Sequence, residues 1–363
     1  MKILVGMSHP AHFHLFRKTM DILKRNDHTV SVVITPKDVL EDLLKESNID
    51  YYKLVERNDY KGFTGKFDKL ISSSLKLDKL VREFHPDLMI GSFTQMTWVG
   101  RRRRIPNIFF GEDDITYTFL QSLITYPFAN HIVAPEVTKV GIFTSKKIAY
   151  PGTQKLAYLH PHVFTPDALC IPEIDVKKPY AIIRLVALNA YHDVAKRGID
   201  AEMLRTITER LKPFGSVYIS SEKPLPEEFE AYRLPVDSSK IHHALAFAGL
   251  FIGDSQSMAV EAALLGTPTL RINDFAAKIS VLNMLERDYG LTSSFKTGHI
   301  GEMLQKTDEL IHKQDIREEY EKKRSRFMEH AVEVSAFFAW FIENYPSSVK
   351  MLKENPRYSD KFQ

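Results

Sequence analysis

The first half of the chain alternates short apolar runs with longer amphipathic segments. Buried strands are predicted by the apolar or β-branched runs at 3–5, 29–34, 88–90, 108–110 and 131–134. Helices are predicted by the apolar residues at helical spacing in 13–24, 39–47 and 67–84. Strands that are separated by helices form right-handed βαβ units, in which helices cover both faces of a parallel sheet. The pattern therefore predicts a first doubly wound α/β domain.

A proline-rich stretch at 151–179 interrupts this alternation and is typical of an interdomain linker. The alternation then restarts. Strands are expected at 180–185, 217–220, 250–252 and 269–272, with helices at 199–212, 239–247, 258–265 and 278–289. The sequence thus predicts an α/β protein with two doubly wound domains, at 1–165 and 175–345, that face a cleft. In such sheets ligands bind at the carboxyl ends of the strands.

Composition and charge exclude several classes of protein. The chain has 363 residues, of which 44% are hydrophobic and 26% charged, as in globular proteins. No apolar run approaches the roughly 20 residues that a membrane-spanning helix needs. The short apolar start is followed by Ser8-His9-Pro10, which indicates a first strand and not a secretory signal. A single cysteine, Cys170, excludes an internal disulfide and predicts a reducing cytoplasm. The net charge of +3 is mild, and with no recognised binding module we expect no nucleic-acid partner.

The most informative segment follows the predicted strand at 250–252 and begins Asp254-Ser255-Gln256-Ser257. Hydroxyl residues cap a helix that begins near Ser257, and the free N–H groups of a helix start bind phosphate. Glu261 lies four residues further on, about 6 Å along the helix axis. This spacing lets the helix start hold a diphosphate while the Glu261 carboxylate accepts from ribose hydroxyls. The alternative is an ordinary capped helix with a solvent-facing glutamate, although Glu261 is the one ionised residue of an Ala/Leu-rich helix.

The pattern D-S-x-S-x-x-x-E-A-x-x-x-G-x-P, from Asp254 to Pro268, resembles the nucleotide-sugar motif in the second domain of GT-B enzymes. These include the UDP-N-acetylglucosamine 2-epimerases and the peptidoglycan N-acetylglucosaminyltransferase. The epimerases carry two glycines where this chain has Gln256 and Ser257. Over the whole chain, the HPAHFH opening at 9–14, the segment 151–159 and the segment 254–268 are similar to the GT-B-like family called domain of unknown function 354.

This resemblance implies a GT-B-like fold with two Rossmann-like domains. The first would be the acceptor-side domain and the second would bind the nucleotide-sugar. In GT-B folds the closing helices pass from one domain to the other, so the segment 346–363 is expected to form a proline-bent helix that completes the first domain.

The chain departs from the epimerase pattern at three places. The epimerases have an acid after the strand equivalent to 88–90, a paired glutamate before the segment like 124–126, and a His-Arg pair after the first strand of the second domain. Here the corresponding stretches read Gly91-Ser92, Thr118-Phe119 and Arg184-Leu185. Epimerisation at C2 needs groups that remove and return a proton. The changed positions therefore disfavour that chemistry.

Two places in the first domain carry candidate catalytic residues. His12, in the opening loop, aligns best with the histidine of the glycosyltransferase loop and is a candidate base, because neutral imidazole can deprotonate a sugar hydroxyl. Its neighbours His9 and His14 either buttress the helix or contact the acceptor, and a zinc site is not expected from three histidines on one tight loop. Asp113, in the acidic run after the strand 108–110, is the second candidate base, with Glu112 as a possible acceptor contact. Alternatively these acids simply begin a helix.

Further candidates are basic or apolar. Arg184 ends the first strand of the second domain and either clamps a diphosphate or forms an interdomain salt bridge. Gln154 and Lys155 are lesser candidates for phosphate. Arg101 begins a run of four arginines that is either a solvated helix end or, with Phe63, a contact to anionic lipid or acceptor.

These observations predict a cytoplasmic glycosyltransferase that uses a nucleotide-sugar, UDP-linked, and an unidentified glycan or lipid-linked acceptor in cell-surface glycan synthesis. The donor phosphates would lie on the helix start Ser255-Gln256-Ser257 and on Arg184, and the ribose on Glu261. Asp254 is a further candidate for binding the nucleotide. We expect no metal and no cofactor, because a helix dipole and basic side chains stabilise the leaving diphosphate. If the acceptor is lipid-linked, we expect the protein to contact the inner face of the membrane peripherally. The alternatives are a nucleotide-sugar epimerase or hydrolase, and a non-catalytic nucleotide-sugar-binding protein.

Overall fold

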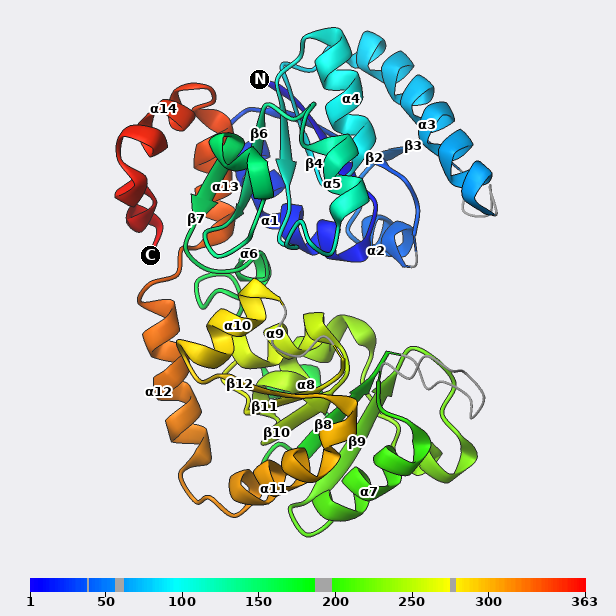
Figure 1. The fold of residues 1–363 in the computed structure, drawn as a ribbon, viewed down its shortest axis with the longest axis vertical. Helices are drawn as coiled ribbons and strands as arrows, with labels where there is room; N and C mark the ends of the chain where they lie inside the picture. Colours follow the sequence, from blue (N-terminus) through cyan, green and yellow to red (C-terminus); the bar gives the residue numbers. More distant parts are fainter. Residues whose placement is uncertain (38, 56–61, 187–197, 275–278) are drawn as a thin grey trace. The chain divides into compact units, whose positions relative to one another are not determined.

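The computed structural model describes residues 1–37, 39–55, 62–186, 198–274 and 279–363, with the backbone alone for 62–67 (Figure 1). These residues form two compact units. Unit 1 comprises Met1–His160 and His330–Gln363, and unit 2 comprises Pro161–Glu329. Both are α/β units in which parallel strands alternate with helices. The fold class predicted from the apolar runs is confirmed.

Unit 1 is built on a seven-stranded sheet in which every described pair of strands is parallel. The strand order is β3-β2-β1-β4-β5-β6-β7. The strands are β1 (Lys2–Met7), β2 (Thr29–Ile34), β3 (Tyr51–Lys53), β4 (Leu88–Gly91), β5 (Asn107–Phe110), β6 (His131–Pro135) and β7 (Lys147–Tyr150). The helices are α1 (Pro10–Arg25), α2 (Leu40–Glu46), α3 (Gly62–Phe84), α4 (Thr94–Arg103), α5 (Phe119–Thr125), α6 (Leu156–Leu159), α13 (Val334–Glu343) and α14 (Ser347–Glu354), with 3-10 helices η1 (Gly141–Lys146) and η6 (Pro356–Phe362).

Unit 2 has a five-stranded parallel sheet in the order β12-β11-β10-β8-β9. Its strands are β8 (Tyr180–Leu185), β9 (Ser216–Ser221), β10 (Leu250–Gly253), β11 (Thr269–Ile272) and β12 (Thr292–Phe295). The helices are α7 (Ala201–Leu211), α8 (Ile241–Phe247), α9 (Gln256–Leu264), α10 (Ser280–Arg287), α11 (Ile300–Ile311) and α12 (Ile316–Met328), with 3-10 helices η2 (Ala168–Cys170), η3 (Glu227–Tyr232), η4 (Ser238–Lys240) and η5 (Thr297–His299).

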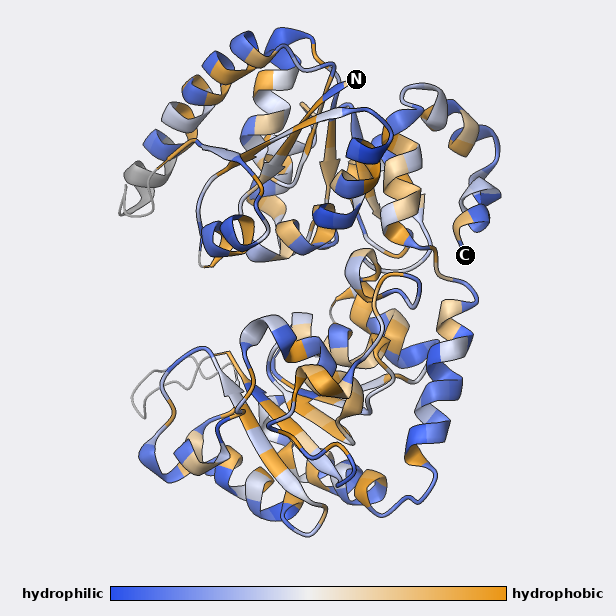
Figure 2. Ribbon diagram, turned by 180° about the vertical axis from the view of Figure 1, so that it is seen from behind, coloured by the Kyte–Doolittle hydropathy of each residue, from blue (hydrophilic) through white to orange (hydrophobic). Residues whose placement is uncertain are grey.

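The return of the chain to unit 1 differs from the expected domain boundaries. Unit 2 begins at Pro161 and ends at Glu329, so α13 belongs to unit 1. The predicted boundary at 345 had placed this segment in the second domain. Helix α13 is apolar on nearly all sides, and Figure 2 shows it coloured mostly hydrophobic. Its Phe338 ring lies 4.7 Å from the ring of Phe110 on β5 and 5.4 Å from that of Tyr150 on β7. A helix with no polar face must be buried, and the sheet of unit 1 provides the surface that buries it.

Each sheet has one point at which the strand order reverses. In unit 1 this switch point lies between β1 and β4, and in unit 2 it lies between β8 and β10. Ligands of doubly wound sheets bind outside the carboxyl ends of the strands at such points. The fold therefore favours a ligand-binding site in the loops after β1, β4, β8 and β10. Among the described helices, none is long and apolar enough to cross a membrane.

Candidate functional site

The loop after β10 ends in a capped helix start. Ser255 is the N-cap of α9, and its Oγ accepts a hydrogen bond from the backbone N–H of Met258 at 3.3 Å. The N–H groups of Gln256 and Ser257, at the first two helical positions, have no partner within the helix because no turn precedes them. Ser257 is exposed and Gln256 is half-buried. The geometry is thus that of a helix start with N–H groups available to an anion, as the motif predicts.

Asp254 organises this loop through backbone contacts. Its Oδ1 accepts from the Val186 N–H at 2.8 Å, and the Ile199 N–H also donates to the carboxylate. Burial raises the pKa of Asp254, while these N–H donors and Arg184 oppose the rise. Asp254, predicted to bind the nucleotide-sugar donor, therefore joins two segments through hydrogen bonds, one ending at Val186 and one containing Ile199. A carboxylate occupied in this way has little capacity to bind a second ligand.

Glu261 lies one turn along α9 and has a partner that the sequence reading missed. His242 Nε2, on α8, is 3.6 Å from Glu261 Oε2, and the two side chains are 15% and 14% exposed. His242 also packs against the ring of Phe164, at a centroid distance of 6.1 Å. The signal in the sequence was the histidine pair His242-His243 in the helix that precedes β10. Glu261 is half-buried, so it is not the solvent-facing glutamate of the alternative interpretation.

Arg184, at the end of β8, is engaged within unit 2. Its guanidinium donates to Ser220 Oγ at 2.8 Å and to Glu222 Oε1 at 2.7 Å. The side chain is 16% exposed, and among the described residues its Nε has no hydrogen-bond partner. The ion pair with Glu222 lies within unit 2. The alternative hypothesis for Arg184 was a salt bridge between the two domains. A phosphate on Arg184 would have to compete with Glu222.

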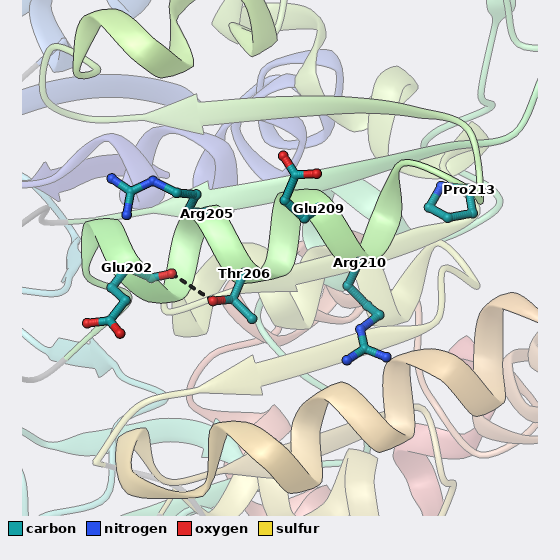
Figure 3. Close-up of a pocket in the computed structure, with 6 residues that line it drawn as sticks. All are labelled: Glu202, Arg205, Thr206, Glu209, Arg210 and Pro213. Carbon is teal, nitrogen blue, oxygen red and sulfur yellow. Dashed lines mark hydrogen bonds between the residues drawn. The ribbon is translucent and has the colours of Figure 1, made fainter.

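A hollow of about 570 Å³ lies on the outer surface of α7 (Figure 3). Its lining consists of Glu202, Arg205, Thr206, Glu209, Arg210 and Pro213. Arg205 and Arg210 are already paired, with Glu228 and Asp308. The hollow is lined only by α7 and the turn after it, and it adds no candidate residue.

In unit 1, His12 lies at the start of α1, directly after β1. Its Nδ1 accepts from the Ser8 N–H at 3.1 Å. Burial, followed by the charges of His9, Lys37 and Lys155, lowers the pKa of His12 from 6.5 to about 3. The ring is therefore neutral near pH 7, and because Nδ1 accepts a hydrogen bond, the proton lies on Nε2. His12 is predicted from the sequence as a base, whereas with its proton on Nε2 it is placed as a hydrogen-bond donor.

The acidic run after β5 separates into three different environments. Glu112 Oε1 accepts from the Gln154 N–H at 2.7 Å, and its Oε2 pairs with Lys155 Nζ. Asp114 is buried and accepts from the Lys139 N–H at 2.7 Å. Asp113 is exposed, yet desolvation by the surrounding protein and the neighbouring Glu112 charge raise its pKa. Of the three acids, Asp113 is thus the one placed to take up a proton.

Lys155 joins these two groups of residues. Its charge lowers the pKa of both His12 and Asp113, and it forms the ion pair with Glu112. We call His12, Glu112, Asp113 and Lys155 the unit 1 polar cluster. Gln154 and Lys155, predicted as lesser phosphate candidates, here hold Glu112 in place.

The remaining predicted residues lie at the edge of this cluster or outside it. His9 caps α1, its Nδ1 accepting from the Ala11 N–H at 3.2 Å, and His14 packs 5.2 Å from the ring of Tyr158. Both positions match the buttressing alternative. Arg101 is exposed in the last turn of α4. Phe63 lies in α3, and its side chain is outside the described residues. Within the described residues, no group of three or more His, Cys, Asp or Glu is arranged to hold a metal ion.

The family model described as "Protein of unknown function (DUF354)" matches residues 1–320. The chain belongs to this DUF354 family. The resemblance drawn from the HPAHFH opening and the 254–268 motif is confirmed. None of the curated protein sequences compared with the chain matches it.

Solved structures similar to this DUF354 chain share its fold at low sequence identity. An S. aureus MnaA–UDP co-structure has a TM-score of 0.68 and 11% identity, covering 96% of this chain and 98% of its own. The Neisseria meningitidis UDP-GlcNAc 2-epimerase bound to UDP-GlcNAc has a TM-score of 0.68 and 15% identity, covering 95% and 100%. Acinetobacter baumannii MurG has a TM-score of 0.60 and 14% identity, covering 94% and 99%. The DUF354 chain therefore has the GT-B fold.

The buried, neutral state of His12 predicts how the stability of this DUF354 protein depends on pH. A pKa that is lowered from 6.5 to about 3 means that the unfolded chain binds the proton first. The stabilisation is complete above pH 6.5 and is lost as the pH falls from 6.5 toward 3. We expect wild type to lose about 2–3 kcal/mol more than His12→Gln between pH 6.5 and about pH 4, as measured by urea unfolding. The lowered pKa of His131, about 4, acts in both proteins and cancels. Equal acid slopes would show that the imidazole is not held neutral.

Proposed function

We propose that this DUF354 protein is a glycosyltransferase that transfers a sugar from a nucleotide-sugar, UDP-linked, to a hydroxyl acceptor. The observation that carries the proposal is the start of α9, where available N–H groups are followed one turn later by the half-buried Glu261. Two proteins of the same fold are described as bound to UDP and to UDP-GlcNAc. Their likeness supports the fold, and the choice of ligand is our proposal.

The proposed donor site uses three features of unit 2. The diphosphate lies at the start of α9, where the N–H groups of Gln256 and Ser257 and the helix dipole stabilise its negative charge. The ribose hydroxyls donate to Glu261, whose carboxylate is oriented by His242. Arg184 can bind the phosphates only if its ion pair with Glu222 breaks, so we give Arg184 a secondary role in holding the diphosphate. Asp254 positions the loop and does not bind the donor.

The unit 1 polar cluster supplies the groups for the acceptor. Asp113 takes the proton of the acceptor hydroxyl. The hydroxyl oxygen of the acceptor forms a bond to C1 of the sugar while the bond from C1 to the diphosphate breaks. The raised pKa of Asp113 suits a base, because proton transfer is most effective near the operating pH. His12 Nε2–H donates a hydrogen bond to developing negative charge, and Lys155 holds Glu112 beside Asp113.

The two alternatives remain distinguishable by product. A hydrolase or an epimerase would release sugar or an isomerised nucleotide-sugar without an acceptor, and a binding protein would release neither. We favour transfer because the stretches Gly91-Ser92 and Thr118-Phe119 stand where the epimerases, by the resemblance, have acids. We propose that the reaction needs neither cofactor nor metal and takes place in the cytoplasm, where the free Cys170 would stay reduced.

The test of the donor site is the substitution Glu261→Ala. Loss of a charged hydrogen bond should weaken binding of UDP-N-acetylglucosamine by about ten- to hundredfold in calorimetry. Glu302→Ala is a matched control, because Glu302 also pairs with a histidine, His299, but lies on α11. The control should bind like wild type, and both variants should keep the wild-type melting temperature within a few degrees. Unchanged affinity in Glu261→Ala would refute the donor assignment.

A further inference from the structure

Helix α5 exposes its large apolar side chains together with Gln121 and buries Ser122 and Thr125. The exposed apolar side chains are Phe119, Leu120, Leu123 and Ile124, at 54%, 76%, 41% and 42%. Their spacing places all four on one face of the helix. The opposite face carries Ser122 and Thr125, which are 1% and 0% exposed. An ordinary surface helix has the reverse arrangement, so the exposed face of α5 does not serve the core.

Hydrogen bonds hold α5 in this orientation. Thr125 Oγ1 lies 2.8 Å from Thr94 Oγ1 on α4, and Ser122 Oγ lies 3.0 Å from Thr118 Oγ1. Buried hydroxyls need such partners, and turning the helix over would break the bond between Thr125 and Thr94, whereas Thr118 is the N-cap of α5 itself. Figure 1 shows α5 beside α4 in unit 1. The outward apolar face is therefore a fixed feature of the surface.

The exposed apolar region continues beyond α5 and includes amphipathic aromatic side chains. Phe128 and Tyr117 are each 41% exposed. The Trp98 ring lies 6.2 Å from that of Phe128, and its Nε1–H donates to the Ile124 carbonyl at 2.6 Å. We call Tyr117, Phe119, Leu120, Leu123, Ile124 and Phe128 the α5 apolar surface. Tyrosine and tryptophan are the side chains that favour the boundary between water and a bilayer.

Cations flank the α5 apolar surface. Lys146 Nζ donates to the carbonyls of Tyr126, Pro127 and Ala129 at 3.0, 2.7 and 2.8 Å. Arg101 is exposed on α4, one turn after Trp98. Burial lowers the pKa of Lys146, and the nearby charge of Arg101 lowers it further. The segment 115–131 contains no acidic residue, and Asp113 and Asp114 directly precede it. The region thus combines exposed apolar groups with positive charge.

We propose that the α5 apolar surface and Arg101 dock on the surface of an anionic lipid bilayer. Apolar side chains enter the boundary of headgroups and acyl chains, while Arg101 pairs with lipid phosphate. A contact between two copies would bury the same apolar surface against itself, and the oligomeric state distinguishes it from docking on a bilayer. Docking needs neither donor nor acceptor, so the inference does not rest on the proposed function.

The test is co-sedimentation of the full chain with vesicles of phosphatidylcholine, with and without phosphatidylglycerol. We expect binding to the phosphatidylglycerol vesicles that weakens with salt. The double variant Leu120→Ser/Leu123→Ser should bind about tenfold more weakly to them, because it removes inserted apolar area. Arg101→Glu should also weaken this binding about tenfold. All three changes are at exposed positions, and circular dichroism checks that the variants fold.

Matched controls lie in unit 2. Leu169→Ser removes a leucine that is 87% exposed, and Arg287→Glu reverses an exposed arginine at the end of α10. Both should bind vesicles as wild type does. Absence of vesicle binding by wild type, or equal losses in the control variants, would overturn the proposal. So would a dimer in sedimentation velocity that Leu120→Ser/Leu123→Ser dissociates while vesicle binding is unaffected, because the surface would then join two copies.

Discussion

Replacing Asp113 by asparagine is expected to slow acceptor-dependent release of UDP by about 10²- to 10⁴-fold, the range for removal of a general base. Asp113 is the one acid of its run that is not held by a backbone N–H or a lysine ion pair in the described contacts. Asparagine has a similar shape and cannot take a proton. Binding of UDP-N-acetylglucosamine in calorimetry should stay unchanged, because the proposed donor site lies on unit 2. The assay follows UDP release with a panel of sugar and lipid-linked acceptors.

The pH profile and two controls sharpen this test. Because the pKa of Asp113 is raised, the rate should fall on acidification at a higher pH than for an ordinary aspartate, and Asp113→Asn should lack this acid limb. Asp50→Asn, at an exposed aspartate elsewhere in unit 1, should behave as wild type. A wild-type rate in Asp113→Asn would exclude this residue as the base. If EDTA abolishes wild-type turnover and magnesium restores it, the acidic run is a metal site and the proposed mechanism is wrong.

Truncation of the chain after Tyr345 is expected to destabilise unit 1 severely. Within the removed segment, Val349 and Leu352 are 8% and 7% exposed, and Phe362 packs 5.7 Å from the ring of the fully buried Phe337. Each buried large side chain contributes roughly 1.5–3 kcal/mol, so the loss is about 3–6 kcal/mol for the first two alone. A domain has only about 5–15 kcal/mol in total. Urea unfolding measures the loss, and hydrogen exchange should place it in unit 1.

A shorter truncation provides a graded comparison. A cut after Glu354 removes η6 and its ring contacts with α13, among them the stacking of Tyr358 on Trp340 at 4.8 Å, but keeps α14. Its effect on the free energy of unfolding should therefore be intermediate. Amides of unit 2 should exchange at the wild-type rate in both truncated chains. Full stability after the cut at Tyr345 would show that the closing segment is dispensable to unit 1.

Local patterns were sufficient to predict the central strands and a capped helix at 258–265, which the structure places at 256–264. Runs such as 3–5 and 250–252 are buried on both faces and read as continuous apolar stretches. Ser255 caps a helix with its own hydroxyl, which depends only on residues three positions apart. The short strands β3, β7 and β12 were not predicted. They lie at sheet edges, where exposure alternates irregularly and the apolar signal is weak.

By itself, then, the sequence determined the alternating α/β architecture, the family and the α9 motif with Glu261, because each depends on neighbours along the chain. Only the tertiary structure decided the partners of the site residues: His242 beside Glu261, Glu222 on Arg184, and Lys155 paired with Glu112 while its charge acts on His12 and Asp113. It also assigned α13 to unit 1 and turned the apolar face of α5 outward. These outcomes arise because burial and hydrogen bonding join residues far apart in sequence, and the same apolar pattern can face either a core or solvent.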